Sequence, residues 1–384
     1  MQLLGDFDNV VSAVPLALFD DSVLEFFGDL SKRLMRVHDY SDLATFGFWC
    51  RKAALLKEKA NYPDLGSRIG RGVVFHSTPS NVPVNFAYSF AAGLLAGNAN
   101  IVRLPGREFE QVAIFIEAVR ELISGRHASL APYVCFVRYP PDRNLHDKYS
   151  SACDVRVIWG GDGTIGELRQ SMLKPRATEL TFADRYSIAV INADEYIRAM
   201  DKAKIAQDFY NDTYFSDQNA CTAPRIVFWI GAQKEDAKNL FWGSVRDLAK
   251  ERYELAPVQS VGKLAAFYKA AASVPATLAD SSDWYVTRVG VGDADGELMR
   301  FKYNSGFFFE HDIDALEDML PICGERMQTL TYYGFTREEM SAFVMEHKPR
   351  GIDRVVPMGK SMNFSLVWDG YDLIRQLSRR VTVL

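Results

Sequence analysis

The sequence predicts an α/β protein with two three-layer domains, each a parallel sheet between helices, preceded by a helical N-terminal region. Short apolar strands alternate with helical stretches from about residue 70 to residue 345, as parallel strands with crossover helices do. The chain has 384 residues, more than one typical core holds, which favours two domains. We expect a helical region at 1–66, domains at 67–190 and 191–350, and a segment at 351–384 that packs back at the domain interface.

Helices are predicted throughout the first 66 residues. Ser22, followed three residues later by Glu25, fits a capping box at a helix start. A second amphipathic stretch covers residues 41–59, and the turn-forming residues 61–66 end it. Apolar residues recur at helical spacing behind the capping box, at Phe26, Phe27, Leu30 and Leu34.

Strands and helices are predicted to alternate in both domains. In the first domain, strands are expected at 72–76, 100–104, 133–137 and 154–159, with helices at 82–96 and 108–122. In the second domain, strands are expected at 187–191 and 225–230, with helices at 197–210 and 234–250.

The composition excludes several classes of protein. The net charge of −5 and the scattered Lys and Arg argue against a nucleic-acid surface. The start of the chain lacks a basic signal-peptide region, and the longest apolar run, 82–96, is too short to span a membrane. Five cysteines without a C-x-x-C pair suit a reducing cytoplasm. Six histidines without metal-ligand spacing predict no metal site.

A glycine-rich turn follows the strand predicted at 154–159. It fits the pattern G-x-G-x-x-G and opens a predicted helix, where glycines allow a pyrophosphate to approach backbone N–H groups. The alternative is a tight turn without a ligand. At least three strands precede it, whereas an ordinary dinucleotide-binding domain carries this loop after its first strand. The residues of interest are Gly161, Gly163, Thr164 and Gly166.

Two further polar positions flank predicted elements. Asn81, in Pro79-Ser80-Asn81-Val82-Pro83, is either the N-cap of a helix or an amide donor to a developing oxyanion. Arg103 ends a predicted parallel strand, at the edge where ligands collect in open α/β sheets.

Cys221 differs from the other four cysteines. Those four lie in or beside predicted apolar elements or in a loop, and each is most simply a small apolar residue. Cys221 instead ends an irregular polar stretch, 211–219, before a strand. Because catalytic nucleophiles are often carried on such loops, Cys221 is the candidate nucleophile, with an inert thiol as the alternative.

The order of these motifs resembles that of the aldehyde dehydrogenase superfamily. Residues 79–83 are similar to its P-x-N-x-P loop, and residues 97–105 to its G-N-x-x-x-x-K-P strand. Residues 161–166 fall where that superfamily has G-S-T-x-x-G. Glu179-Leu180 occupies the place of E-L-G-G, and residues 217–221 are similar to G-Q-x-C.

The end of the chain indicates a narrower family. Residues 351–360 and 367–374 resemble the ending of the acyl-CoA reductases of bacterial luminescence operons, the LuxC family of fatty acyl reductases. The resemblance extends over about residues 70–384. It implies an aldehyde dehydrogenase-like fold and NADPH- or NADH-dependent reduction of an acyl thioester, from acyl-CoA or a carrier-bound acyl group, to an aldehyde.

The resemblance also implies roles for single residues. Cys221 is the thiol that forms the acyl-enzyme, Asn81 helps to bind the oxyanion, and Glu179 matches the catalytic glutamate. Thr181 and Phe182 replace the two glycines that follow that glutamate, so Glu179 is equally well a ribose ligand or a structural residue. Glu297 and Glu310 are the candidates for the second glutamate, which contacts the cofactor in that superfamily.

The charges around residue 106 favour NADPH over NADH. Arg103 stands where the superfamily has Lys, and Gly106 stands where many NAD-preferring members carry a ribose-binding glutamate. Arg103 and Arg107 therefore flank a position without a carboxylate, and arginine matches a phosphate in bidentate geometry. The alternative is that both are ordinary exposed arginines.

Several functional readings stay open. The chain is an acyl thioester reductase, an oxidising NAD(P)-dependent aldehyde dehydrogenase, a related semialdehyde or acyl-phosphate reductase, or a non-catalytic subunit of an acyl-transfer complex. Expected partners are the acyl substrate, an acyl-protein synthetase or transferase, and further copies of the chain in a homo-oligomer. The acyl chain length is not predicted, because the aromatic residues suit ordinary core strands as well as a binding site.

Overall fold

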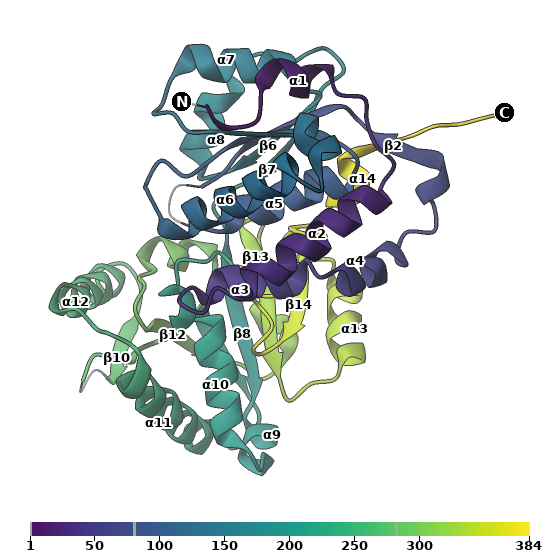
Figure 1. Cartoon of the computed structure of the whole chain (residues 1–384). Coiled ribbons are helices and arrows are strands. Elements are labelled where there is room, and N and C mark those ends of the chain that lie inside the picture. Colours follow the sequence, from purple (N-terminus) through teal and green to yellow (C-terminus); the bar gives the residue numbers. More distant parts are fainter. Residues whose placement is uncertain (1, 80–81, 281–282) are drawn as a thin grey trace. The chain divides into compact units, whose positions relative to one another are not determined.

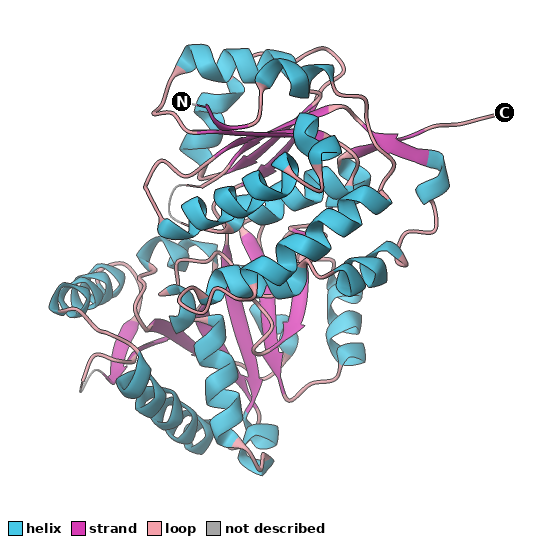
Figure 2. Cartoon of the chain, viewed as in Figure 1, coloured by secondary structure: helices cyan, strands magenta, loops and turns pink. Residues whose placement is uncertain are grey.

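The computed structural model describes residues 2–79, 82–280 and 283–384 (Figure 1). Its elements divide into two compact units, which are described separately. Unit 1 comprises Met1–Ala183 with Phe364–Leu384, and unit 2 comprises Asp184–Asn363. Each unit has a mostly parallel sheet with helices on both faces (Figure 2), which confirms the predicted α/β class.

The division between the units differs from the predicted boundaries. The sequence placed one boundary at 190/191, but this point lies inside the strand β8, Tyr186–Asn192. β8 pairs on both sides with strands of unit 2, so the whole strand belongs there. The predicted segment 351–384 is also divided, because residues from Phe364 onward belong to unit 1.

Unit 1 contains a six-stranded sheet in the order β1-β5-β4-β3-β6-β7. Its neighbouring strands are parallel, except that β1 is antiparallel to β5. The strands are β1 (Gln2–Leu4), β3 (Val73–Ser77), β4 (Ala99–Arg103), β5 (Val134–Val137), β6 (Val155–Trp159) and β7 (Thr178–Phe182). Two short antiparallel pairs complete the unit: β2 (Arg68–Gly70) with β17 (Ser378–Arg380), and β15 (Val367–Trp368) with β16 (Tyr371–Asp372).

Helices cover both faces of this sheet, and successive strand residues face different cores. Val74 packs in the core that includes α2, α5 and α6, whereas Val73 and Phe75 pack in the core that includes α1 and α7. Such double burial explains why these strands are continuous apolar runs. The helices of unit 1 are α1 (Phe7–Ser12), α2 (Asp21–Leu34), α3 (Ser41–Trp49), α4 (Lys52–Lys59), α5 (Asn85–Leu95), α6 (Glu110–Ser124), α7 (Arg143–Ala152), α8 (Asp162–Arg169) and α14 (Leu373–Gln376).

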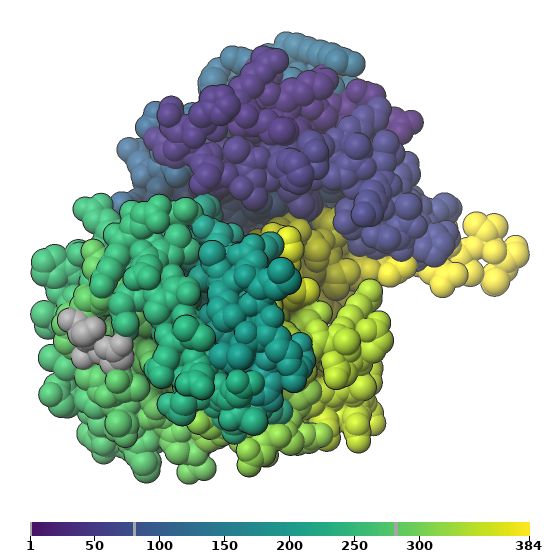
Figure 3. Space-filling model, turned by 90° about the horizontal axis from the view of Figure 1, so that it is seen from below, coloured from purple at the N-terminus to yellow at the C-terminus, as the bar shows by residue number. Residues whose placement is uncertain are grey.

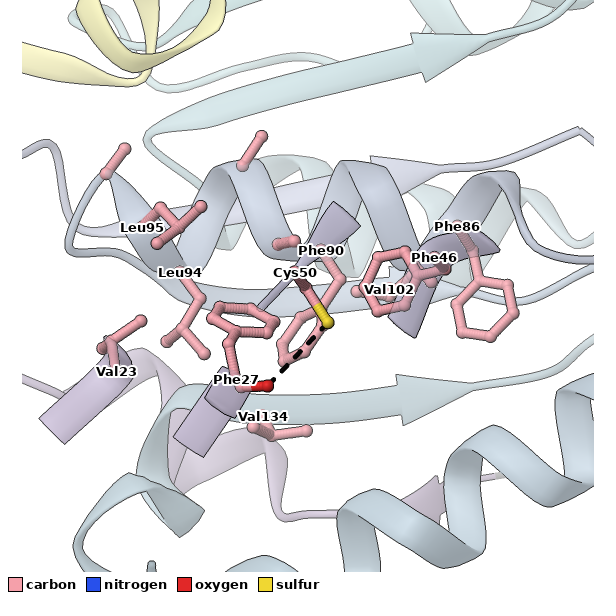
Figure 4. Close-up of a cluster of buried hydrophobic side chains, with 14 of the residues drawn as sticks. Val23, Phe27, Phe46, Cys50, Phe86, Phe90, Leu94, Leu95, Val102 and Val134 are labelled. Atoms are coloured by element: carbon pink, nitrogen blue, oxygen red, sulfur yellow. Dashed lines mark hydrogen bonds between the residues drawn. The ribbon is translucent and has the colours of Figure 1, made fainter. Parts of the chain in front are cut away.

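The first helices pack their aromatic side chains onto α5. Phe27 of α2 lies against Phe90 of α5, with their ring centroids 6.2 Å apart. Figure 4 shows Phe27, Phe46 and Phe90 around the thiol of Cys50, which donates to the backbone oxygen of Phe27. The helical N-terminal region is therefore part of the main core of unit 1.

The predicted capping box at Ser22 is wrong. The N-cap of α2 is Asp20, whose carboxylate accepts the backbone N–H of Ser22 at 2.9 Å. A carboxylate satisfies this N–H group and also complements the positive end of the helix dipole. Glu25 instead forms an ion pair with Lys52 of α4.

Unit 2 contains a seven-stranded sheet in the order β10-β11-β12-β9-β8-β13-β14. Its neighbouring strands are parallel, except that the edge strand β10 is antiparallel to β11. Besides β8, the strands are β9 (Pro224–Ile230), β10 (Ala276–Asp280), β11 (Thr287–Val291), β12 (Phe307–Asp312), β13 (Met327–Tyr333) and β14 (Arg354–Pro357). The α-helices are α9 (Ala193–Arg198), α10 (Lys202–Asp212), α11 (Lys234–Arg252), α12 (Pro257–Ala271) and α13 (Arg337–His347).

The end of the chain leaves the body of unit 1. Figure 3 shows the last residues, in yellow, as a narrow projection, and Val383 and Leu384 are exposed. Among the described residues, every helix falls short of the length or apolar character that a bilayer span needs.

A buried polar chain crosses the core of unit 1. His76 of β3 has no exposed surface; its Nδ1 lies 2.7 Å from Ser89 Oγ and its Nε2 lies 3.0 Å from Asn100 Oδ1. Trp159 donates its indole N–H to the same Ser89 oxygen at 2.9 Å. Because Asn100 Oδ1 only accepts, we assign the proton to His76 Nε2, and Nδ1 then accepts from Ser89. With His76 neutral, each of these buried polar groups has a hydrogen-bond partner.

Stability is expected to fall in acid because of His76. Burial lowers the pKa of His76 to about 4 from the ordinary 6.5, so between these values the unfolded chain binds a proton that the folded chain does not. The contribution is present above pH 6.5 and is lost as the pH falls to 4, by about 3 kcal/mol. Urea unfolding of His76→Gln and wild type at pH 7 and pH 4 measures this, and the variant should show a smaller loss. Equal losses in both proteins would contradict the assignment.

Candidate active site

The glycine-rich turn lies where the strand order of unit 1 reverses. β3 is followed along the chain by β4 and β5 on one side, and the chain then returns to place β6 and β7 on the other side. Ligands of open α/β sheets bind at such a switch point, outside the carboxyl ends of the strands. Gly161 follows the carboxyl end of β6 and is the N-cap of α8. The mismatch with an ordinary dinucleotide-binding order therefore has a structural cause: this turn follows the fourth strand of the unit's parallel sheet but still adjoins the first.

The glycines of this turn are not explained by packing. A Cβ atom placed on Gly161, Gly163 or Gly166 would meet open space, and none of the three has a positive φ. The first turn of α8, including Thr164, is exposed. This steric openness fits the close approach of a phosphate-bearing group, but the carboxylate of Asp162 in the first turn would oppose its charge.

Positive charge comes from the end of β4, which is separated from β6 by β3. Arg103 is its last residue and is half-buried, with its guanidinium 4.9 Å from the ring centroid of Tyr139. Arg107 is exposed, and its guanidinium lies 5.2 Å from the ring centroid of Phe109. Arg103 thus ends, and Arg107 follows, a strand whose carboxyl end lies at the same edge of the sheet as the glycine-rich turn, so both add positive charge at that edge.

An aromatic pair at the same edge was not predicted as part of a site. Trp159 ends β6, Phe182 ends β7, and their rings stack with centroids 3.7 Å apart at 9°. The indole of Trp159 is fixed by its hydrogen bond to Ser89. Two aromatic residues at the ends of apolar strands are the signal that could have indicated this feature.

Glu179 is not brought together with the glycine-rich turn. It is the second residue of β7 and pairs in register with Arg156, whereas the turn follows the other end of these strands. Its Oε2 accepts from Arg156 Nε at 2.8 Å, and its Oε1 accepts from Arg169 Nε at 2.7 Å. Both carboxylate oxygens are therefore engaged by guanidinium groups, an arrangement typical of a structural ion pair.

Cys221 lies in unit 2, in the turn that precedes β9. The other four cysteines are buried, and burial raises the pKa of three of their thiols, Cys135, Cys153 and Cys323, to about 12. Burial also raises the pKa of the Cys50 thiol. Cys221 is partly exposed, so among the five it is the thiol best placed to meet a substrate.

The Cys221 turn, residues 217–222, has an unusual backbone that its side chains hold in place. Asp217 and Gln218 both have positive φ, 49° and 52°, in the left-handed region that residues other than glycine seldom adopt. The buried amide of Gln218 donates to Pro224 O at 3.2 Å and to Phe307 O at 3.3 Å, and its oxygen accepts from Gly306 N at 2.8 Å. These bonds tie the turn to the start of β12.

Two further contacts hold the turn. Ser187, at the start of β8, donates its hydroxyl to Cys221 O at 2.7 Å and accepts the N–H of Thr329 at 3.2 Å. Asp217 accepts the hydroxyl of Ser305 at 2.8 Å. The turn therefore rests on the amino ends of three strands of unit 2, and its backbone position is set by residues that the motif alone did not reveal.

Three other predicted positions have different outcomes. Asn81 lies outside the described residues, so its predicted role stays a prediction. Glu310 is buried in β12, where it pairs with Arg288 at 2.7 Å and accepts the indole N–H of Trp229 at 2.9 Å. These contacts fix the Glu310 side chain in the core of unit 2. Glu297 pairs with Arg300 at the surface.

No metal site is apparent in the part of the chain that the structure describes. Its His, Cys, Asp and Glu side chains form no group of three that could hold a metal ion.

Comparison with solved structures places this architecture among the aldehyde dehydrogenases. Aldehyde dehydrogenase 21 from Physcomitrella patens aligns with a TM-score of 0.62 at 13% identity over 93% of this chain and 82% of that one. A 1-pyrroline-5-carboxylate dehydrogenase from Thermus thermophilus aligns with a TM-score of 0.63 at 12% identity over 98% and 84%. The protein therefore has an aldehyde dehydrogenase-like fold, as its motifs predicted.

The chain belongs to the acyl-CoA reductase (LuxC) family, whose model matches residues 53–263. It is similar to the long-chain acyl-protein thioester reductase of Photorhabdus laumondii, with 23% identity over 323 residues, or 82% of this chain. It is also similar to the protein of the same description from Vibrio harveyi, with 22% identity over 81% of this chain. The chain spans 63% of the length of each relative.

Replacing Glu179 by Gln is expected to lower stability. Arg156 is 2% exposed, and its hydrogen bonds to a charged partner would become bonds to a neutral amide, at a cost of about 2 kcal/mol. Glu167→Gln, at an exposed position of α8, serves as the control and should change the free energy of unfolding little. Urea unfolding of the three proteins tests this. A Glu179→Gln protein with undiminished stability would remove the structural assignment.

Proposed function

We propose that this protein reduces an acyl thioester to an aldehyde, with Cys221 as the acyl-accepting nucleophile and NADPH as the hydride donor. The observation that carries the proposal is the state of Cys221: in a LuxC-family chain with four buried cysteines, it is the partly exposed thiol, on a turn with a fixed backbone. The names of the two relatives support a thioester substrate, from acyl-CoA or a carrier-bound acyl group.

The chemistry at Cys221 has two stages. Its thiolate attacks the carbonyl carbon of the acyl thioester, the C–S bond of the substrate breaks, and the donor thiol leaves with a proton from solvent. A bound nicotinamide cofactor would supply a hydride to the acyl group. This would give a thiohemiacetal on Cys221, whose collapse releases the aldehyde and regenerates the thiolate.

The oxyanion of that thiohemiacetal needs a hydrogen-bond donor. Asn81 is the proposed donor, from the resemblance of its motif, and one such donor lowers a barrier by roughly 3 kcal/mol. Glu179 receives no step in this mechanism, because its oxygens are engaged by Arg156 and Arg169. Hydrolysis of the acyl-enzyme, which the oxidising direction needs, calls for a general base, so this ion pair favours the reductive direction.

The cofactor assignment rests on unit 1. The open glycine positions Gly161, Gly163 and Gly166 admit a pyrophosphate sterically, and Arg103 with Arg107 supplies positive charge. A phosphate on the ribose would add an anion for these arginines, which favours NADPH over NADH. We further propose a homo-oligomer that works in a reducing cytoplasm and receives acyl groups from an acyl-protein synthetase or transferase.

Replacing Cys221 by Ala is expected to reduce aldehyde formation from acyl-CoA and NADPH to the background rate, because no other accessible thiol replaces it. Cys323→Ala is the matched control, since Cys323 is buried, and it should retain activity. The measurement is NADPH oxidation together with aldehyde trapping. Aldehyde formation by a folded Cys221→Ala protein would exclude the proposed nucleophile.

Assays with aldehyde and NADP⁺, with and without CoA, separate a reductase from an oxidising dehydrogenase.

Replacing Arg103 and Arg107 together by Ala is expected to reduce kcat/KM for NADPH by about tenfold or more, as loss of a charged hydrogen bond does, and to affect NADH much less. Arg120→Ala is the control, because Arg120 pairs with Glu117 on α6. Steady-state kinetics with both cofactors test the assignment. Equal losses with NADPH and NADH, or no preference in the wild type, would contradict it.

A further inference from the structure

Arg225 is a buried cation directly behind the Cys221 turn. It is the second residue of β9, four positions after Cys221, and only 7% of it is exposed. Its Nη1 donates to Tyr303 O at 2.9 Å and to Asn304 Oδ1 at 2.7 Å, and its Nη2 donates to Gln218 O. The guanidinium therefore joins the turn to the facing loop, residues 303–306.

This arginine differs from the other arginines that are buried to a similar degree beside a carboxylate. Arg156 and Arg288 are 2% and 8% exposed, and they pair with Glu179 and Glu310 at 2.5 and 2.7 Å. The guanidinium of Arg225 donates to neutral oxygen atoms, and no carboxylate among the described residues forms an ion pair with it. Burying a cation against neutral groups costs free energy, so such a charge usually serves a nearby anion.

Two carboxylates and one thiol, which are negative when ionised, act on Arg225 at longer range. Burial lowers the pKa of Arg225 to about 10, which still leaves the guanidinium charged at neutral pH. The charges of Asp184, Asp217 and Cys221 oppose this lowering of the pKa. The attraction between a guanidinium and a thiolate is mutual, so a positive Arg225 favours the anionic form of Cys221.

The two carboxylates among these three groups are already engaged by other residues. Asp184 forms ion pairs with Lys302 at 3.3 Å and Arg326 at 3.0 Å. Because these ion pairs already compensate the charge of Asp184, Asp184 needs less compensation from Arg225.

Asp217 is engaged in the same way from the other side of the turn. It accepts the hydroxyls of Ser305 and Tyr253, and it lies within electrostatic range of Lys263, a buried lysine on α12. Burial lowers the pKa of Lys263 to about 8, so this ammonium group loses its proton in mildly alkaline solution, whereas Arg225 keeps its charge. Arg225 therefore stays positively charged at pH values at which Lys263 has lost its proton.

We propose that Arg225 is a positioning residue that holds a buried positive charge behind the Cys221 turn and thereby keeps Cys221 in its thiolate form. The thiolate, not the thiol, is the nucleophile, so this charge sets the reactivity of the turn at neutral pH. The same guanidinium keeps the left-handed Gln218 in place through its carbonyl oxygen. The inference rests on the proposed function, because it concerns the thiol that accepts the acyl group.

The test follows the pH dependence of Cys221 alkylation by iodoacetamide, read by peptide mass spectrometry. The buried cysteines, whose thiol pKa values are raised, do not compete in the folded protein. In Arg225→Gln the midpoint of the alkylation profile should rise by about one pH unit or more, as loss of a nearby opposite charge predicts. Arg225→Lys should retain most of the wild-type midpoint, and Arg288→Lys, at the Glu310 pair, should leave it unchanged.

A second variant keeps the test decisive if Arg225→Gln does not fold. Asn304→Asp places a carboxylate against Arg225 Nη1 without removing the guanidinium, and it should raise the midpoint in the same direction. Asn304→Ala, which loses the hydrogen bonds of Asn304 with both Arg225 and Asn219 but adds no charge, should shift it less. An unchanged midpoint in folded Asn304→Asp or Arg225→Gln would overturn the inference. If the midpoints shift but wild type forms no aldehyde, the proposed function fails and the role of Arg225 stands.

Discussion

The structure around Cys221 depends on the buried amide of Gln218. This side chain satisfies backbone groups at Pro224, Gly306 and Phe307, and in doing so it holds two successive residues of the turn in left-handed conformations. Such conformations cost about 1–3 kcal/mol each and persist only when the surroundings determine them. The thiol is therefore presented by a backbone that side chains from the neighbouring strand ends have fixed in advance, which suits a nucleophile that must meet a carbonyl carbon in one geometry.

The buried arginines of this protein have two kinds of hydrogen-bond partner. Where an arginine stabilises a sheet, a glutamate lies directly against it, as for Arg156 with Glu179 and Arg288 with Glu310. Beside Cys221, the arginine is bound by neutral oxygens. The first arrangement cancels charge, and it engages both carboxylate oxygens of Glu179, the glutamate in the catalytic-looking motif. The second leaves a positive charge beside the Cys221 turn, and this charge is the basis of our proposal that Cys221 reacts as a thiolate at neutral pH.

The sequence alone indicates most of the fold but only part of the site. Short continuous apolar runs predicted β3, β4, β6, β8 and β9 to within about two residues, because these strands are buried on both faces. The polar loop singled out Cys221, and its strand context singled out the glycine-rich turn. The pairing of Glu179 with Arg156 and the contact of Arg225 with Asn304 escaped prediction, because they join residues that approach one another only after the sheets form. The cap at Asp20 was missed because a nearby serine matched the capping-box pattern equally well.

The most direct measurement locates the acyl group. The protein is mixed with an acyl-CoA without nicotinamide cofactor, quenched in acid, digested and mapped by mass spectrometry, and a second sample is chased with NADPH before quenching. The account predicts one acyl adduct, on the peptide that contains Cys221, and its loss with release of an equal amount of aldehyde after the chase. An adduct on another residue, or an adduct on Cys221 that NADPH does not discharge as aldehyde, would contradict it.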